Sequence, residues 1–258
     1  MPLFTTAKLA AIAVTLLVAA APATLRAAVI DVPPGPGTAQ GPAPFTFYGT
    51  SGSRAQQFYG SSLFSSLSGP QSITGFALRS FPGAAPSGFF GNTLNISNTT
   101  IRLSTTSRGD ELGTLPDTMF SNNVGADVTT VFQGALSLVT LQPGTFDYMV
   151  QFATPFTYNP SFGNLLLDVS IPVGATVSGS PGTFGFLTFD NANNLNDGVF
   201  SVSSIFDGNS TTGFRDTSGA ITRFFVERLP QPVPEPMSLA LFGAGLAGLC
   251  LARRRRLS

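Results

Sequence analysis

The 258-residue chain contains no histidine and no tryptophan, and it has one cysteine and one lysine. Without histidine, the chain cannot use Ser-His-Asp or Cys-His catalysis, or a zinc site built on imidazole. A lone Cys250 cannot form an intrachain disulfide, so the cysteine count carries no information about the compartment. We interpret Cys250 as a small residue within an apolar segment, with lipidation as the alternative.

Charge is also scarce, at 10% of residues. Between Ala28 and Glu235, seven Arg stand against thirteen Asp and Glu, a net charge of −6. Such a surface repels phosphates, so we expect no nucleic-acid partner. Apolar residues, in contrast, make up 43% of the chain and include 24 Phe, which predicts a packed core despite 28 Gly and 20 Pro.

The N-terminus has the pattern of a secretory signal peptide. An apolar run over 9–21 follows Lys8 and ends in Ala-Pro-Ala, which fits the small-x-small cleavage pattern. A cut near Ala27 or Ala28 is the alternative. We therefore predict a signal peptide over 1–27 and export from the cytoplasm.

The C-terminus predicts a short membrane span. Sixteen uncharged residues, 237–252, would form a helix of about 24 Å, somewhat shorter than a hydrocarbon core of ~30 Å. The four arginines that follow, Arg253, Arg254, Arg255 and Arg256, are expected to stay cytoplasmic by the positive-inside rule. Everything upstream would then lie outside.

A proline-rich segment, "LPQPVPEP", precedes this span. Proline at every second position excludes helix and ladder pairing, so we expect an extended, accessible stalk. Pro234-Glu235-Pro236, the apolar span and the arginine cluster together resemble the PEP-CTERM sorting signal of Gram-negative bacteria. The resemblance places this signal over 230–258.

In that family the signal is recognised by exosortase, a membrane cysteine transpeptidase or protease, and its bearers are exported proteins linked with exopolysaccharide and biofilm matrix. The resemblance thus implies that Pro234, Glu235 and Pro236 form the processing motif. It also implies exosortase and, transiently, the inner membrane as partners, with the cell surface or exterior as destination. The four arginines are then the expected membrane stop, which keeps the C-terminus in the cytoplasm.

The middle of the chain predicts an all-β domain over 45–229, after a Pro/Gly-rich linker over 28–44. Short β-rich runs alternate with Gly, Pro, Asn and Ser clusters, and no helical stripe is present. The expected strands lie at 45–49, 72–80, 99–107, 128–141, 145–152, 163–171, 182–189, 198–206 and 221–229. About ten strands without intervening helices indicate an antiparallel β-sandwich, with a jelly roll as one such arrangement.

Little in this domain points to chemistry. The remaining catalytic option is a pair of carboxylates, as in glycosidases, but no spacing singles out two acids. The acids considered are Asp110, Glu111, Asp117, Asp127, Asp147 and Asp168. We therefore expect no enzyme and no cofactor.

The densest polar cluster, "DNANNLNDG" from Asp190 to Gly198, offers oxygen ligands of the kind that calcium prefers. Asp190, Asn193 and Asp197 are the weak calcium candidates, although the order does not match an EF-hand. An ordinary Asx-turn loop is the favoured interpretation.

Three functions remain open for the exported domain. The first is a structural or adhesive matrix protein; the second is a carbohydrate-binding module for the cell's own exopolysaccharide. The third, a carboxylate-dependent hydrolase, is disfavoured by the missing histidine and by the absence of any arranged pair of acids. Asn95, Asn98 and Asn209 stand in Asn-x-Ser/Thr sequons and would tolerate glycans.

Overall fold

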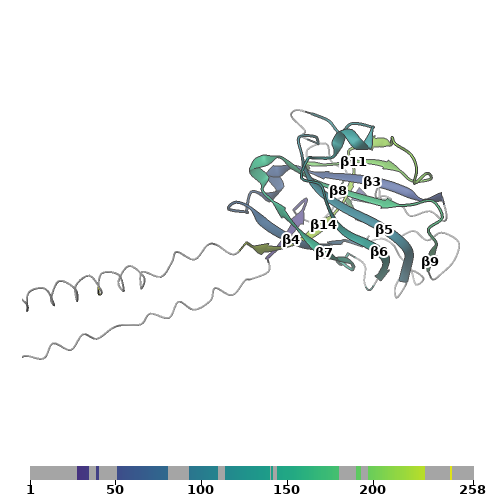
Figure 1. Cartoon of the computed structure of the whole chain (residues 1–258), viewed down its shortest axis with the longest axis horizontal. Coiled ribbons are helices and arrows are strands. Elements are labelled where there is room, and N and C mark those ends of the chain that lie inside the picture. Colours follow the sequence, from purple (N-terminus) through teal and green to yellow (C-terminus); the bar gives the residue numbers. More distant parts are fainter. Residues whose placement is uncertain are drawn as a thin grey trace, which may run out of the picture.

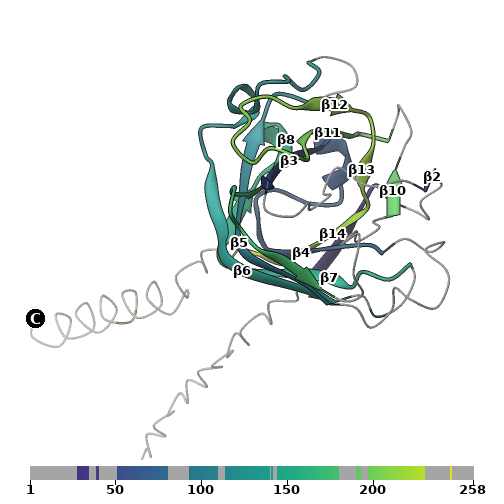
Figure 2. The same ribbon diagram turned by 90° about the vertical axis from the view of Figure 1, so that its right-hand side faces the viewer.

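The computed structural model describes residues 28–34, 39–40, 51–80, 93–109, 114–139, 141, 144–179, 190–192, 197–229 and 245. These residues form two antiparallel sheets packed face to face, which confirms the predicted all-β sandwich. Figure 2 looks along the strands and shows the two sheets on opposite sides of the core.

The first sheet has four strands in the order β1 (Ala28–Val32), β14 (Thr222–Arg228), β4 (Gln71–Leu78) and β7 (Tyr148–Tyr158). The second has seven strands. Six follow the order β12 (Phe214–Asp216), β11 (Val199–Ser204), β3 (Ser53–Tyr59), β8 (Asn164–Ile171), β5 (Thr93–Thr106) and β6 (Thr129–Val139). The seventh, β9 (Val177–Gly179), pairs with the start of β5, whereas β8 pairs with the rest of β5. Both strands therefore lie on the same side of β5, one after the other along its length.

A small ribbon of β13 (Gly219–Ala220), β10 (Asp190–Ala192) and β2 (Ala39–Gln40) lies beside the two sheets (Figure 2). Three short 3-10 turns complete the described chain: η2 (Ser61–Phe64), η3 (Phe120–Asn123) and η4 (Pro160–Phe162).

Most strands expected from the sequence are present. The predictions at 72–80, 128–141 and 198–206 correspond to β4, β6 and β11. The prediction at 145–152 overlaps β7, in which buried and exposed side chains alternate: Tyr148 and Val150 are buried while Met149 is exposed. The predictions at 45–49 and 182–189 lie outside the described residues.

The structure corrects the predicted linker over 28–44 at its first residues. Ala28–Val32 forms strand β1 and pairs along its whole length with β14. Ile30 and Val32 face the core, and the Asp31 carboxylate receives two hydrogen bonds from Arg223, at 2.7 and 2.8 Å. Because prolines follow this strand closely in the sequence, the predicted linker included the strand as well.

The main core lies between the sheets and is rich in aromatic rings. Phe64 packs against Tyr158 and Phe224, with ring centroids 5.0 and 5.7 Å apart, and Tyr59 meets Phe224 edge-on at 5.1 Å. Edge-to-face and tilted contacts of this kind are favourable beyond the area they bury. The phenylalanines of the described core are thus used in packing between the sheets.

A second, smaller core covers the outer face of the seven-stranded sheet. Segment 114–124, which contains η3, crosses this face and buries Phe120 against it; the other members are Phe58, Leu166, Phe200 and Val202. Strand β8 is therefore buried on both faces, which explains its continuous apolar sequence, and it confirms the strand predicted at 163–171.

Two polar side chains inside the main core, Gln57 and Tyr59, are paired. The Gln57 side chain donates to the Ala220 carbonyl (2.7 Å) and accepts from the Ala220 amide (2.9 Å). Its amide group thus makes the same pair of hydrogen bonds to Ala220 that the backbone of a neighbouring strand would make. The Tyr59 hydroxyl lies 2.7 Å from Thr222 Oγ1. Complete burial raises the pKa of Tyr59 far above its usual value, and the hydrogen bond to Thr222 offsets only part of this.

This burial predicts a loss of stability in alkali. Because the folded state keeps Tyr59 protonated, deprotonation above pH ~10 favours the unfolded chain. The contribution of protonated Tyr59 to stability is fully present below the pKa that this tyrosine has in the unfolded chain. Above that pKa, the free energy of unfolding should fall by about 1.4 kcal/mol per pH unit. Urea unfolding of the mature chain between pH 8 and 12 measures this slope, which Tyr59→Phe should reduce; an unchanged slope in that variant would contradict it.

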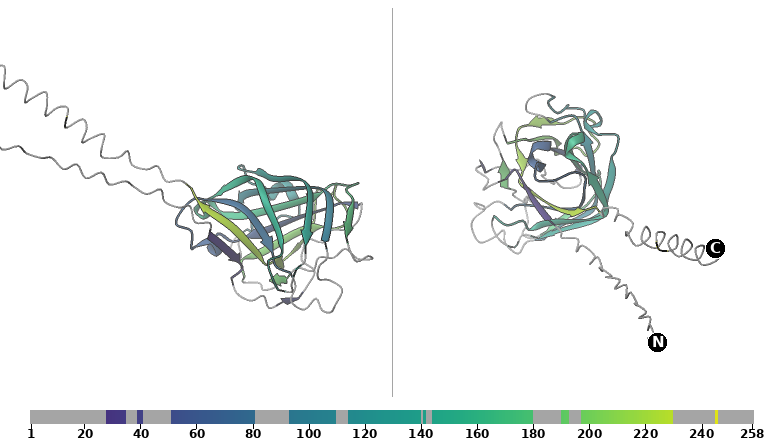
Figure 3. Two further views of the ribbon diagram at one scale, coloured as in Figure 1. Left: turned by 90° about the horizontal axis from the view of Figure 1, so that it is seen from below. Right: turned by 90° about the vertical axis from the view of Figure 1, so that its left-hand side faces the viewer.

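The described chain begins and ends at the same end of the sandwich. Ala28 pairs with Val226 at the start of β1, and Arg228 at the end of β14 pairs with Gln71. Figures 1 and 3 show β14 reaching this end with β1 beside it. We call it the stalk end, because the predicted stalk follows Leu229, and we call the opposite end the distal end.

Candidate functional site

The residues of the predicted sorting signal lie outside the described chain, except Gly245. This holds for Pro234, Glu235 and Pro236, for Arg253 to Arg256, and also for the predicted signal peptide over 1–27. No helix among the described residues combines the length and the apolar character needed to cross a bilayer. The structure does fix the point from which the signal extends, at the end of β14.

The calcium candidates are only partly described. Asp190 lies in β10, where it pairs with Gln40, and Asn193 lies outside the described residues. The Asp197 carboxylate accepts the Val199 amide at 2.9 Å, the geometry of an Asx-turn. Within the described chain, no three Asp, Glu, His or Cys residues gather in a way that would hold a metal ion.

The acids considered for catalysis have structural partners. Asp127 accepts the Thr105 amide at 2.8 Å, and Asp147 accepts the Leu141 amide at 2.7 Å. Asp117 accepts from Asn122 and from the Met119 amide, and these two hydrogen bonds, with Asn122 the larger cause, lower its pKa. Asp110 and Glu111 lie outside the described residues.

Asp168 belongs to a buried network that sequence reasoning missed. It is 2% exposed and accepts two hydrogen bonds from the Arg54 guanidinium, at 3.1 and 2.6 Å, and one from Gln56 at 3.2 Å. Gln56 also accepts from Asn123, and the Arg54 guanidinium lies 4.7 Å from the Phe120 ring centre. The network therefore fastens η3 onto the sheet rather than opening to solvent.

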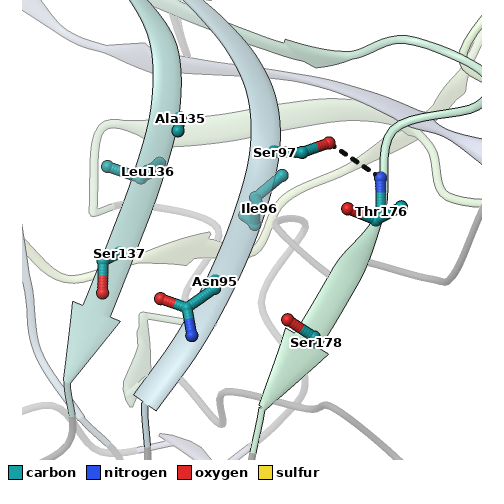
Figure 4. A pocket seen from close by; sticks show the side chains of 8 residues that line it. All are labelled: Asn95, Ile96, Ser97, Ala135, Leu136, Ser137, Thr176 and Ser178. Atoms are coloured by element: carbon teal, nitrogen blue, oxygen red, sulfur yellow. Dashed lines mark hydrogen bonds between the residues drawn. The ribbon is translucent and has the colours of Figure 1, made fainter.

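An open groove crosses the outer face of the seven-stranded sheet near the distal end (Figure 4). Its walls come from β5, β6 and the segment that enters β9. Eight uncharged residues line it, most of them small and polar: Asn95, Ile96, Ser97, Ala135, Leu136, Ser137, Thr176 and Ser178.

The groove follows from a β-bulge in β5. Ile96 pairs with Leu136 and Thr99 with Gly134, so two residues of β5 oppose one residue of β6. At the bulge the Ser97 hydroxyl accepts the Thr176 amide at 2.9 Å, and the Ser97 amide donates to the Thr176 carbonyl, also at 2.9 Å. The sequence predicted β6 here, but the strand predicted at 99–107 begins after the groove residues of β5, which starts at Thr93, and nothing in the sequence indicated that a third segment would join the two.

Exposed phenylalanines stand at both ends of the sandwich. Phe214, 86% exposed, lies in β12 opposite Ser203, near the distal end. Phe162, 79% exposed, lies in η4 at the stalk end. Neither was singled out from the sequence, since exposure depends on the fold.

Comparison with known proteins identifies one functional element, at the C-terminal end of the sequence. No curated protein is significantly similar to the chain. A family model described as the PEP-CTERM protein-sorting motif matches residues 232–256, which include the predicted processing motif and the arginine cluster. This motif implies processing by an exosortase and export to the cell surface. The chain therefore ends in a PEP-CTERM protein-sorting motif.

Proposed function

We propose that this protein is a non-enzymatic structural or adhesive component of an exopolysaccharide-containing extracellular matrix. It is exported by its signal peptide and pauses as a single-span intermediate with the C-terminus inside. An exosortase then cuts it near Pro234-Glu235-Pro236, and the sandwich remains at the surface or in the matrix.

The position of the chain ends carries this proposal. Both ends of the described domain lie at the stalk end, so the distal end and the groove point away from the site of processing. A domain held in this way presents its free surface to the exterior. The predicted stalk would leave the domain at this same end, directly after β14.

A non-enzymatic role is supported by the carboxylates. Asp117, Asp127, Asp147 and Asp168 are each held by backbone or side-chain donors. A glycosidase instead needs two carboxyl groups facing one another across a substrate, about 5–10 Å apart. The acids described here serve turns and strand contacts.

The test combines fractionation with mass spectrometry of the mature protein. We expect the protein in the surface or matrix fraction, with its C-terminus within the stalk. Enzymatic removal of the exopolysaccharide should release it from that fraction. Recovery of an intact C-terminus at Ser258, or of protein unaffected by polysaccharide removal, would contradict the proposal.

A second candidate function, carbohydrate binding, is favoured by the groove in Figure 4. Hydroxyl and amide side chains on a rigid sheet match the alternating donors and acceptors of a neutral sugar chain. The bulge and β9 fix the three walls relative to one another, so little would have to be ordered on binding.

If the groove binds sugar, the mature protein should be retained on the isolated exopolysaccharide. The double variant Asn95→Ala/Ser137→Ala should weaken retention, because it removes polar groups from two walls of the groove. Thr157→Ala, an exposed position on β7, serves as the matched control. Equal retention of both variants would exclude this site.

A further inference from the structure

The stalk end carries a compact platform made of two connections, residues 60–70 with η2 and residues 159–163 with η4. The register places η4 beyond the last paired residues: Arg228 pairs with Gln71, Gln71 pairs with Tyr158, and η4 follows directly. The platform therefore projects in the direction in which the chain leaves β14.

Several contacts make this platform rigid. The Ser61 amide donates to Asn164 Oδ1 at 2.8 Å, and the Tyr158 hydroxyl donates to the Gly163 carbonyl at 2.8 Å. Asn159 caps η4 by accepting the Ser161 amide at 3.1 Å. Gly163 has a φ of +145°, and a Cβ there would lie 2.6 Å from the Thr106 carbonyl oxygen, so the turn is tightly seated.

On this rigid support the Phe162 ring is 79% exposed. Ordering a mobile loop when it binds a partner costs conformational entropy. Because η4 is already held in place, little of this cost would arise at Phe162. The platform has no charged residue in either connection. An anionic lipid surface is bound chiefly through Lys and Arg, so this composition favours a protein partner over the bilayer.

The length of chain beyond β14 limits which protein this is. Five residues separate Leu229 from Glu235, so at about 3.1 Å per residue in the polyproline conformation the motif would lie within ~20 Å of Leu229, at the stalk end of β14. Any enzyme that holds Pro234-Glu235-Pro236 in its active site must therefore approach the stalk end closely.

We propose that the platform, through Phe162, docks on the outward-facing surface of the membrane enzyme that cuts the stalk. The inference rests on the processing step of the proposed function and adds a recognition surface outside the sorting motif. Docking raises the local concentration of the motif at the active site and so speeds the cut.

The experiment follows cleavage of the full chain in cells that contain the enzyme, by pulse-labelling. Phe162→Asp is expected to slow the cut about tenfold, the effect of losing one anchoring aromatic contact. Phe162→Tyr should retain most of the rate. Phe214→Asp is the matched control, since it changes an equally exposed ring at the distal end and should leave the rate unchanged.

Each other outcome has a definite meaning. An unchanged rate for Phe162→Asp, or equal slowing by Phe214→Asp, overturns the docking surface while leaving the processing step intact. Binding of the cut, mature protein, which lacks the membrane span, to lipid vesicles that is lost in Phe162→Asp but not in Phe214→Asp would show that the ring contacts lipid, which also overturns it. If the wild-type chain is never cut, the proposed function itself fails.

Discussion

Replacing Glu235 with alanine, or deleting Arg253 to Arg256, is expected to leave export intact and to abolish cleavage of the C-terminus. Glu235 is the only charged residue between Leu229 and Arg253, so it offers the one strong charge-assisted contact in the stalk. We expect the arginines to stop translocation and to set the depth at which the motif stands above the bilayer. Without either element the enzyme meets the wrong side chain or the wrong position.

Membrane fractionation and intact-mass analysis measure this outcome. Both variants should accumulate uncut in the membrane fraction or reach the wrong compartment, whereas Gln231→Ala, a stalk change outside the motif, should be processed normally. Cleaved protein of wild-type mass from the Glu235→Ala chain would contradict the role given to this residue.

Removing Arg54 is expected to lower the free energy of unfolding by about 3–5 kcal/mol. Asp168 is 2% exposed and accepts two hydrogen bonds from Arg54, so Arg54→Ala leaves a buried carboxylate that keeps only the weaker hydrogen bond from Gln56, at 3.2 Å, among its described side-chain donors. The variant also removes the guanidinium that lies over the Phe120 ring and so loosens η3. Urea denaturation of the mature chain measures the loss.

The Asp31–Arg223 pair provides a matched control. It has the same two-bond geometry, but its side chains are 35% and 33% exposed, so water can replace the lost partner. Asp31→Ala should therefore cost no more than about 1 kcal/mol. Similar losses in Arg54→Ala and Asp31→Ala would mean that burial does not set the strength of the first pair.

The sequence predicted strands where burial follows a simple pattern and missed them where it does not. In β14, Phe224 and Val226 are buried while Arg223 and Glu227 on the opposite face are only partly buried, as the alternation requires. Strand β3 was missed because Arg54, Gln56 and Gln57 suggest a solvent-exposed segment. Gln57 is nevertheless fully buried, since its amide pairs with Ala220, 163 residues away.

The same distinction applies to the candidate sites. The sorting motif is contiguous, so order and spacing within one short segment were enough to predict it. The groove is not contiguous: Asn95, Ser137 and Thr176 come from three segments far apart in the chain. Their proximity depends on the pairing of β5 with both β6 and β9, which no local pattern encodes.

The placement of β14 between β1 and β4 also determines how the domain bears mechanical load. Both neighbours run antiparallel to β14, and their hydrogen bonds lie across its axis. A pull on the stalk acts along that axis, so the bonds of both ladders are strained together instead of opening one after another. If the distal end is held by the matrix, the domain resists detachment in shear, and its lifetime under tension is set by the rate of unfolding.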